Sequence, residues 1–300
     1  MATTTRSTGG GESRPPVVFV HGNPETATVW GPVLEELDRD DVFALSPPGF
    51  GAPLPTGFEA TVSGYRGWLE SQLEAFKRPV DLVGHDWGGA HVVQVAMHRP
   101  DLIRSWTSDM LQLFAPEYVW HPLAQVWQQE GPGETSVAEL FGGAFEQRLA
   151  VVHGMGITGI AAERFATGFD ETLGRAVLSL LRSAVQPVMA EAGSGLAKAR
   201  QRPGLALIAT ADPNGNVEMH RWAAQQAGAD IAFLEGVGHW WPVQDPRPAV
   251  EAMTRFWGRV DLERSGDVCE RFDDREPNLV ITELLRAACR QPWNTPLSSL

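Results

Sequence analysis

The sequence predicts an α/β protein in which a mainly parallel sheet is covered by helices on both faces and interrupted by an inserted helical cap. Short apolar runs alternate with helical patterns through most of the chain. These runs lack the polar alternation of half-exposed strands, as is typical of parallel strands buried on both faces. Between 112 and 201 the alternation stops, and helical patterns follow one another without a convincing strand. The sheet segments on either side therefore bracket an insertion.

The first half of the chain supplies four strand-like runs. Each is short, rich in β-branched or large apolar residues, and bounded by glycine, proline or polar residues. They fall at 17–20, 41–45, 80–83 and 102–108. Helical patterns with apolar residues on one face lie between them, at 28–37, 63–76 and 88–98.

After the insertion the strand and helix order resumes. Strand-like runs at 204–210 and 230–234 enclose a helix at 216–227, and a closing helix follows at 246–257. The predicted organisation is a flexible leader at 1–14, a core at 15–111 and 202–260, a helical cap at 112–201 and a C-terminal extension at 261–300.

The short leader has a consequence for the sheet. It is too short to supply two further strands, so the run at 41–45 is expected at or near an exposed edge, and exposed edges are usually covered. The extension has one apolar segment, at 278–285. We expect this segment to dock on the sheet edge or on a partner subunit, which leaves a homodimer open.

Composition and charge argue against several classes of function. Lys and Arg number 24 against 37 Asp and Glu, for a net charge of −13, which disfavours a nucleic-acid partner. No run approaches the roughly 18 apolar residues of a membrane span, and 1–14 lack the apolar core of a signal peptide. We therefore expect a cytoplasmic protein without a membrane partner. Cys269 and Cys289 are too few for a disulfide framework or a Cys-based metal site.

A motif between the third strand-like run and its helix carries the chemistry. Gly84-His85-Asp86-Trp87-Gly88 has the strand–turn–helix context of a nucleophile elbow, with Asp86 where serine usually stands. Asp212 then follows one late strand and His239 the next, in the order nucleophile, acid, base. Asp109 also lies at a strand end and is the alternative to Asp212 for orienting the imidazole.

These motifs, together with His21-Gly22-Asn23-Pro24, resemble the α/β-hydrolase superfamily, specifically its Asp-nucleophile branch of haloalkane dehalogenases and epoxide hydrolases. The resemblance covers 15–258 and is vague in the cap. The short leader, and the Ser46-led loop at 46–51 where an aspartate-led version is usual, depart from the pattern. The resemblance implies an α/β-hydrolase fold and a hydrolase that needs no cofactor and no metal.

A carboxylate nucleophile changes the reaction that an elbow carries out. A serine that displaced a leaving group from saturated carbon would form an ether, which water does not readily cleave. A carboxylate forms an ester instead, which a water deprotonated by His239 can hydrolyse. The backbone N–H groups of Trp87 and Asn23 are the expected oxyanion donors for this second step.

The leaving group decides the substrate class. A halide needs only donors that keep their protons, such as the indole of Trp87 and the amide of Asn23, and the resemblance implies halide binding at these two positions. An epoxide oxygen needs a proton, commonly from cap tyrosines. Besides Tyr65 in the core, only Tyr118 is present. The sequence therefore favours a haloalkane dehalogenase.

Two alternatives stay open. One is a diol-forming epoxide hydrolase, in which Tyr118 or a cap histidine, His121 or His153, assists ring opening. The other is a non-hydrolytic ligand receptor on the same fold. In the favoured case the partners are a small apolar organic substrate and water. The residues expected to line the pocket are Phe50, Phe114, Tyr118, His153 and Trp240.

Overall fold

The computed structural model of the protein describes residues 14–265. Its centre is a six-stranded sheet in the order β2-β1-β3-β4-β5-β6, and every neighbouring pair of strands is parallel. The strands are β1 (Val17–Val20), β2 (Val42–Leu45), β3 (Val80–Gly84), β4 (Ile103–Ser108), β5 (Gly204–Ala209) and β6 (Asp230–Leu234). The predicted α/β class with a mainly parallel sheet is confirmed.

The burial of the strands follows their place in the sheet. β1 and β3 pair with each other in the middle and are buried at every residue. β2 lies at one edge of the described sheet, where the sequence predicted 41–45 to lie, and its Phe43 is 43% exposed. The segment 278–285, expected to dock on such an edge, lies outside the described residues.

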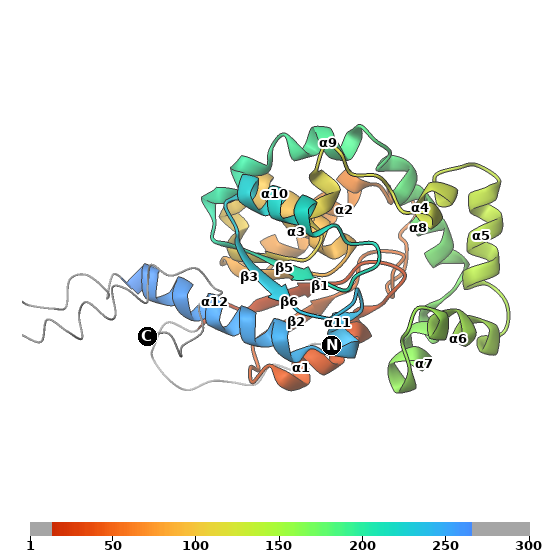
Figure 1. Ribbon diagram of the computed structural model, residues 1–300, viewed down its shortest axis with the longest axis horizontal. Helices are drawn as coiled ribbons and strands as arrows, with labels where there is room; N and C mark the ends of the chain where they lie inside the picture. The colour runs from red at the N-terminus through yellow and green to blue at the C-terminus, as the bar shows by residue number, and fades with distance from the viewer. Residues whose placement is uncertain (1–13, 266–300) are drawn as a thin grey trace, which may run out of the picture.

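Helices cover both faces of the sheet (Figure 1). One face carries α1 (Gly31–Glu36) and α12 (Arg247–Ser265), and the other carries α2 (Val62–Glu74), α3 (Trp87–His98) and α10 (Val217–Ala227). Short 3₁₀ turns at Ala27–Trp30, Pro100–Leu102, Leu111–Phe114 and Leu196–Gln201 join these elements. None of the described helices is both long and apolar enough to cross a membrane.

The closing helix is longer than predicted. The helix predicted at 246–257 spans Arg247–Ser265 and so also passes 260, the predicted end of the core. The buried guanidinium of Arg104 on β4 forms an ion pair with Asp261, and Arg259 forms one with Asp230 of β6. These contacts hold the last turns of α12 against the sheet, which the apolar spacing alone did not indicate.

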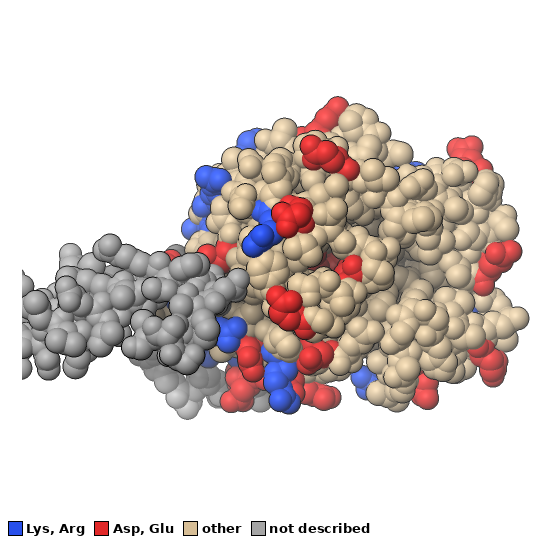
Figure 2. All heavy atoms as spheres, in the orientation of Figure 1, with Lys and Arg blue, Asp and Glu red and all other residues tan. Residues whose placement is uncertain are grey.

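The chain between β4 and β5 forms helices with no strand between them. They are α4 (Pro122–Trp127), α5 (Pro132–Phe141), α6 (Phe145–Gly154), α7 (Gly159–Gly168), α8 (Glu171–Ser183) and α9 (Val188–Gly193). α5 packs on α8 and α6 on α7, and α4 to α8 form a lobe beside the sheet (Figure 1). Figure 2 shows this lobe as largely uncharged on one face, with acidic side chains at its outer edge. The short α11 (Trp241–Gln244) precedes α12.

Candidate active site

Asp86 lies in the turn between β3 and α3, with φ 51° and ψ −128°. This positive φ is costly for a residue with a Cβ, and such backbone strain is concentrated at functional sites. The turn is tight because Gly88 packs directly on β1: a Cβ there would come within 2.1 Å of the Val20 carbonyl oxygen. The sequence thus builds a sharp strand-to-helix corner that presents the Asp86 carboxylate.

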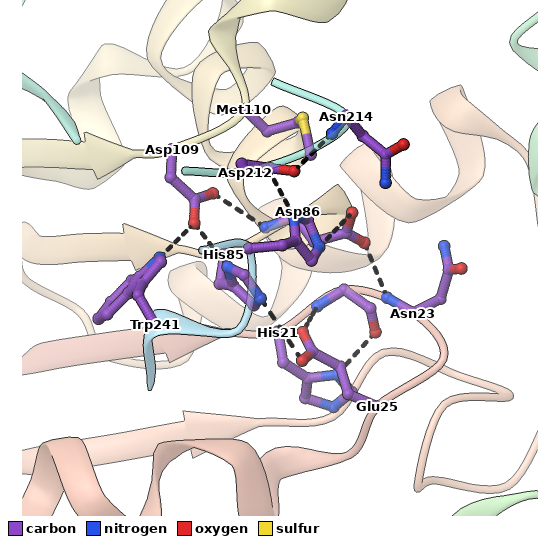
Figure 3. A network of polar contacts seen from close by, with 12 residues as sticks. His21, Asn23, Glu25, His85, Asp86, Asp109, Met110, Asp212, Asn214 and Trp241 are labelled. Carbon is purple, nitrogen blue, oxygen red and sulfur yellow. Dashed lines mark hydrogen bonds and ion pairs between the residues drawn. The ribbon is translucent and has the colours of Figure 1, made fainter. Parts of the chain in front are cut away.

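One oxygen of that carboxylate is held by the loop after β1. The Asn23 backbone N–H donates to Asp86 Oδ1 at 2.9 Å, as Figure 3 shows. Gly22 makes this approach feasible, since a Cβ on it would lie 2.1 Å from Asp86 Oδ1 and 2.5 Å from the backbone nitrogen of Trp87. The amides of Asn23 and Trp87 therefore both border the space around Oδ1.

The other oxygen faces an imidazole. His239 Nε2 lies 3.7 Å from Asp86 Oδ2, and His239 Nδ1 lies 2.8 Å from Asp212 Oδ2. The second oxygen of Asp212 accepts from the Asn214 backbone N–H at 2.8 Å. Because an ionised carboxylate only accepts hydrogen bonds, His239 donates from Nδ1. In the neutral ring, Nε2 then faces Asp86 with a lone pair.

The charges in the site shift the pKa of both partners. Burial by itself lowers the pKa of His239, but the hydrogen bond to Asp212 and the charges of Asp212 and Asp86 outweigh burial and raise it above its ordinary value. Burial raises the pKa of Asp212, but the hydrogen bond and charge of His239 outweigh burial and hold it below its usual range. Asp212 is therefore ionised near neutral pH.

Asp109, the alternative acid, contacts other groups. Its Oδ2 lies 2.5 Å from His85 Nδ1 and accepts from the Trp241 indole at 2.6 Å, while its Oδ1 accepts from the Asp86 backbone N–H at 2.9 Å. Asp109 therefore lies behind the turn that carries Asp86 (Figure 3). The acid that contacts His239 is Asp212.

A cavity of about 440 Å³ opens above Asp86 and His239. Its floor is formed by loops at the carboxyl ends of the strands, and its opposite wall by the helical lobe, which contributes His121, Leu123, Trp127, Met155 and Leu181. Aliphatic and aromatic side chains dominate the lining. A small apolar molecule fits such a cavity.

Comparison with known proteins identifies the family to which the chain belongs. A model of the "Alpha/beta hydrolase family" matches residues 17–252, which is most of the chain and includes Asp86, Asp212 and His239. The chain belongs to the α/β-hydrolase family.

Individual relatives of this hydrolase match over shorter stretches. An epoxide hydrolase of Caballeronia sordidicola is 33% identical over 101 residues, which make up 30% of this chain and 29% of that enzyme. A haloalkane dehalogenase of Agrobacterium fabrum is 28% identical over 92 residues, 30% of each chain. The matched stretch spans only about a third of the length of each of these curated relatives.

Solved structures share the fold of this hydrolase over a longer range. A loop variant of the haloalkane dehalogenase DbeA from Bradyrhizobium elkanii aligns with a TM-score of 0.64 at 16% identity, covering 85% of this chain and 93% of that one. A thioesterase domain from the curacin biosynthetic pathway aligns with a TM-score of 0.61 at 14% identity, covering 82% and 93%. At these identities the likeness shows the fold alone.

Three N–H donors of the hydrolase border the cavity beside Asp86. Asn23 and Trp87, the donors expected from the sequence, both line it, and Asn23 Nδ2 is buried without a hydrogen-bond partner. Trp120 also lines the cavity, and its ring stacks on Trp87 with centroids 5.7 Å apart. The Trp120 indole nitrogen is likewise buried without a partner. Buried donors normally have partners, so these two are suited to a bound anion.

The remaining sequence candidates divide into two groups. Tyr118 and Trp240 line the cavity. Phe50, Phe114 and His153 are not among its lining residues. Phe50 is 2% exposed and packs on Tyr65, Phe114 is fully buried in its 3₁₀ turn, and His153 is exposed on α6. The sequence does not indicate whether these three side chains point into the cavity, because the direction of a side chain does not follow from its distance along the chain to a catalytic motif.

Sequence reasoning missed two buried ionisable residues beneath the elbow. Glu25 and His85 are both fully buried, with His85 Nε2 3.7 Å from Glu25 Oε2. Glu25 directly follows His21-Gly22-Asn23-Pro24, and His85 directly precedes Asp86. One sequence signal could have indicated them: an ionisable residue in an otherwise apolar and glycine-rich stretch.

Proposed function

We propose that this hydrolase displaces a leaving group from saturated carbon with the Asp86 carboxylate, hydrolyses the resulting ester, and takes haloalkanes as substrates. The observation that carries the proposal is the orientation of that carboxylate. Oδ1 accepts a hydrogen bond from the Asn23 amide, whereas Oδ2 faces His239 Nε2 at 3.7 Å, and both Asp86 and His239 line the cavity. Oδ2 is then the oxygen that attacks.

In the first step, Oδ2 forms a bond to the substrate carbon while the carbon–halogen bond breaks, and the halide leaves with the bonding electrons. Asp86 becomes a neutral alkyl ester. The buried N–H donors of Asn23 and Trp120, together with the Trp87 indole, stabilise the halide without giving up a proton.

In the second step, His239 Nε2 takes a proton from a water, and the resulting hydroxide attacks Cγ of Asp86. Negative charge develops on Oδ1, where the Asn23 amide already donates. Collapse of this intermediate breaks the bond between Cγ and Oδ2, and the leaving oxygen takes the proton from the His239 imidazolium to give the alcohol. The carboxylic acid that remains loses its proton and restores the carboxylate. Asp212 stabilises the imidazolium of His239 through the 2.8 Å hydrogen bond.

The tyrosines favour haloalkanes over epoxides. The chain has two, and the Tyr65 hydroxyl donates to the Pro48 carbonyl at 2.8 Å in the buried core. That leaves Tyr118 as the one tyrosine able to protonate an epoxide oxygen. Burial raises its pKa well above the ordinary value. Tyr118 lines the cavity, however, so epoxide hydrolysis is the second candidate.

The test combines product analysis with trapping of the ester. The wild-type protein is incubated with primary bromo- and chloroalkanes and with terminal epoxides, and halide release is followed against diol formation. In His239→Gln, ester formation needs no base, so mass spectrometry should find the substrate's alkyl group on the peptide that contains Asp86. Asp86→Ala is the control that should carry no adduct.

An isotope experiment separates this mechanism from direct attack of water. With enzyme in excess over haloalkane in ¹⁸O-labelled water, the alcohol of the first turnover should carry unlabelled oxygen from Asp86. Labelled alcohol in that turnover would contradict the ester. Diol from epoxides without halide release, abolished in Tyr118→Phe, would select the second candidate. Binding of these compounds without turnover would select a receptor.

A further inference from the structure

A chain of buried ionisable side chains lies beneath Asp86 and takes no part in the two steps above. Glu25, His85 and Asp109 belong to three different loops or strand ends, and their side chains are 0%, 0% and 7% exposed. His85 lies between the two carboxylates, with Nδ1 2.5 Å from Asp109 and Nε2 3.7 Å from Glu25. Figure 3 shows the His85 side chain between those of Glu25 and Asp109.

The two ends of this chain hold the two loops that meet at the nucleophile. At one end, Asp109 Oδ1 accepts from the Asp86 backbone N–H at 2.9 Å. At the other, Glu25 Oε1 accepts from the Gly22 backbone N–H at 2.5 Å. The next amide along, that of Asn23, donates to Asp86 Oδ1. Hydrogen bonds at both ends of this chain, joined in the middle by the 3.7 Å approach of His85 to Glu25, therefore connect Asp86 with the Asn23 amide that faces it.

We propose that Glu25, His85 and Asp109 are positioning residues that hold the Asn23 amide against Oδ1 of Asp86, and that they serve hydrolysis of the ester rather than its formation. The proposal rests on the proposed function. During ester formation Asp86 loses negative charge, so a donor at Oδ1 gives no advantage to that transition state. During ester hydrolysis Oδ1 gains a full charge, so the same donor lowers the barrier.

The charges around His85 favour this role. Burial lowers the pKa of His85, but the charges of Asp109, Glu25 and Asp86 outweigh burial and raise it to about 10, so the ring is an imidazolium at neutral pH. Burial raises the pKa of Glu25 to about 7. The other titratable rings that face His85 are His21 and His239.

Aromatic side chains keep water away from this cation. The rings of Trp30, Trp240 and Trp241 all lie within 6.3 Å of the His85 ring, centroid to centroid. In such surroundings an attraction between charges is much less weakened than in water. The cation therefore attracts the Asp109 carboxylate, and the ionised fraction of Glu25, and with them the two loops that carry these residues.

The experiment compares three variants by rapid quench and mass spectrometry. Glu25→Ala removes the acceptor for the Gly22 amide, Glu25→Gln keeps an acceptor oxygen but removes the charge, and Glu35→Ala changes an exposed glutamate on α1. In Glu25→Ala we expect ester hydrolysis to fall by about 10- to 100-fold, less than the roughly 10²- to 10³-fold cost of losing an oxyanion donor outright, because the Asn23 amide is displaced rather than removed. Ester formation should change by less than a factor of about three, so alkylated Asp86 accumulates although His239 is intact.

Glu25→Gln should show a smaller loss in the same step, and Glu35→Ala none. Equal losses in both steps, or no accumulation of alkylated Asp86 in either Glu25 variant, would overturn the proposal. Glu25→Gln keeps the size and acceptor of the native side chain and so guards against misfolding of Glu25→Ala.

A second measurement needs no turnover, so it separates this proposal from the proposed function. Amide hydrogen exchange at Gly22 and Asn23, followed by NMR, should speed up in Glu25→Ala and stay unchanged in Glu35→Ala. Unchanged exchange in Glu25→Ala would overturn the positioning role even if the wild-type protein releases halide. Faster exchange in a protein that forms no ester would reject the proposed function and retain the connection between Glu25 and the loop.

Discussion

Asp212 and His239, which follow β5 and β6, are joined by a hydrogen bond of 2.8 Å between Oδ2 and Nδ1. Asp109, which follows β4, is nearer in sequence to Asp86 but points its carboxylate at His85 and at the backbone of the elbow. The two acids therefore contact different groups: Asp212 contacts His239, and Asp109 contacts the backbone of the turn that carries Asp86.

The first prediction separates these two acids. Asp212→Asn removes the charge that stabilises the His239 imidazolium, and loss of a triad acid costs on the order of 10⁴-fold in turnover. Asp109→Asn leaves that hydrogen bond in place and should cost about 10- to 100-fold, through a loosened elbow. Steady-state kinetics on a haloalkane would measure both. A larger loss in Asp109→Asn would assign the acid role to the earlier strand.

The second prediction concerns pH. In the proposed mechanism His239 must be neutral to take a proton from water in the alkyl-enzyme, where Asp86 is a neutral ester. Burial lowers its pKa, but the hydrogen bond and charge of Asp212 still raise it there. Turnover should therefore rise with pH along a limb whose midpoint lies above the ordinary histidine value of about 6.5. In Asp212→Asn the main raising influence is gone, so the remaining activity should show its midpoint at lower pH. A limb that stays in place in that variant would mean that another group controls it.

Strand positions followed closely from the sequence, whereas one helix start did not. β1 and β6 have the predicted bounds because each is a short apolar run between polar or glycine residues. The helix expected from 28 begins instead at Gly31, after a 3₁₀ turn. Pro32 explains the difference: it has no N–H to donate to the preceding turn, so it fits the first turn of a helix and not its interior.

The catalytic candidates were also accessible from sequence, for a topological reason. In a parallel sheet the carboxyl ends of all strands meet at one edge, so residues that follow β3, β5 and β6 come together there. No comparable rule predicts the direction in which a loop side chain points. Phe50 turns into the core toward Tyr65, and Glu25 faces His85, which is 60 positions away in the sequence. Neither contact leaves a periodic signal.

The third prediction tests the donors at the leaving group. Asn23→Ala removes Nδ2 but keeps the backbone N–H that contacts Asp86, and Trp87→Phe and Trp120→Phe each remove one indole donor. Each loss should lower the dehalogenation rate by about 10²- to 10³-fold, the cost of one donor to a developing anion. Trp222→Phe, on the exposed side of α10, is the matched control. Quenching of tryptophan fluorescence by bromide would report halide affinity independently of turnover.

Equal rates in Trp120→Phe and Trp222→Phe would remove Trp120 from the halide site. Its indole nitrogen would then be buried without a partner for another reason. If the dehalogenation rate falls only in Trp87→Phe and Asn23→Ala, the halide site consists of the two donors expected from the sequence.

The last prediction concerns the close packing that creates the elbow. Gly88→Ala would place a Cβ 2.1 Å from the Val20 carbonyl oxygen, and neither α3 nor β1 can move without displacing the sheet. Gly67 of α2 is also a helical glycine, but a Cβ there meets nothing within 4 Å. Gly67→Ala should therefore stabilise the fold by about 0.5–1 kcal/mol through helix propensity and lower unfolded-state entropy, while Gly88→Ala should destabilise it by about 1–3 kcal/mol or more through overpacking. Urea denaturation of both variants gives the free energies of unfolding directly. If Gly88→Ala were as stable as Gly67→Ala, α3 could not be seated on β1 as closely as this packing requires, and the strained backbone of Asp86 would need another support.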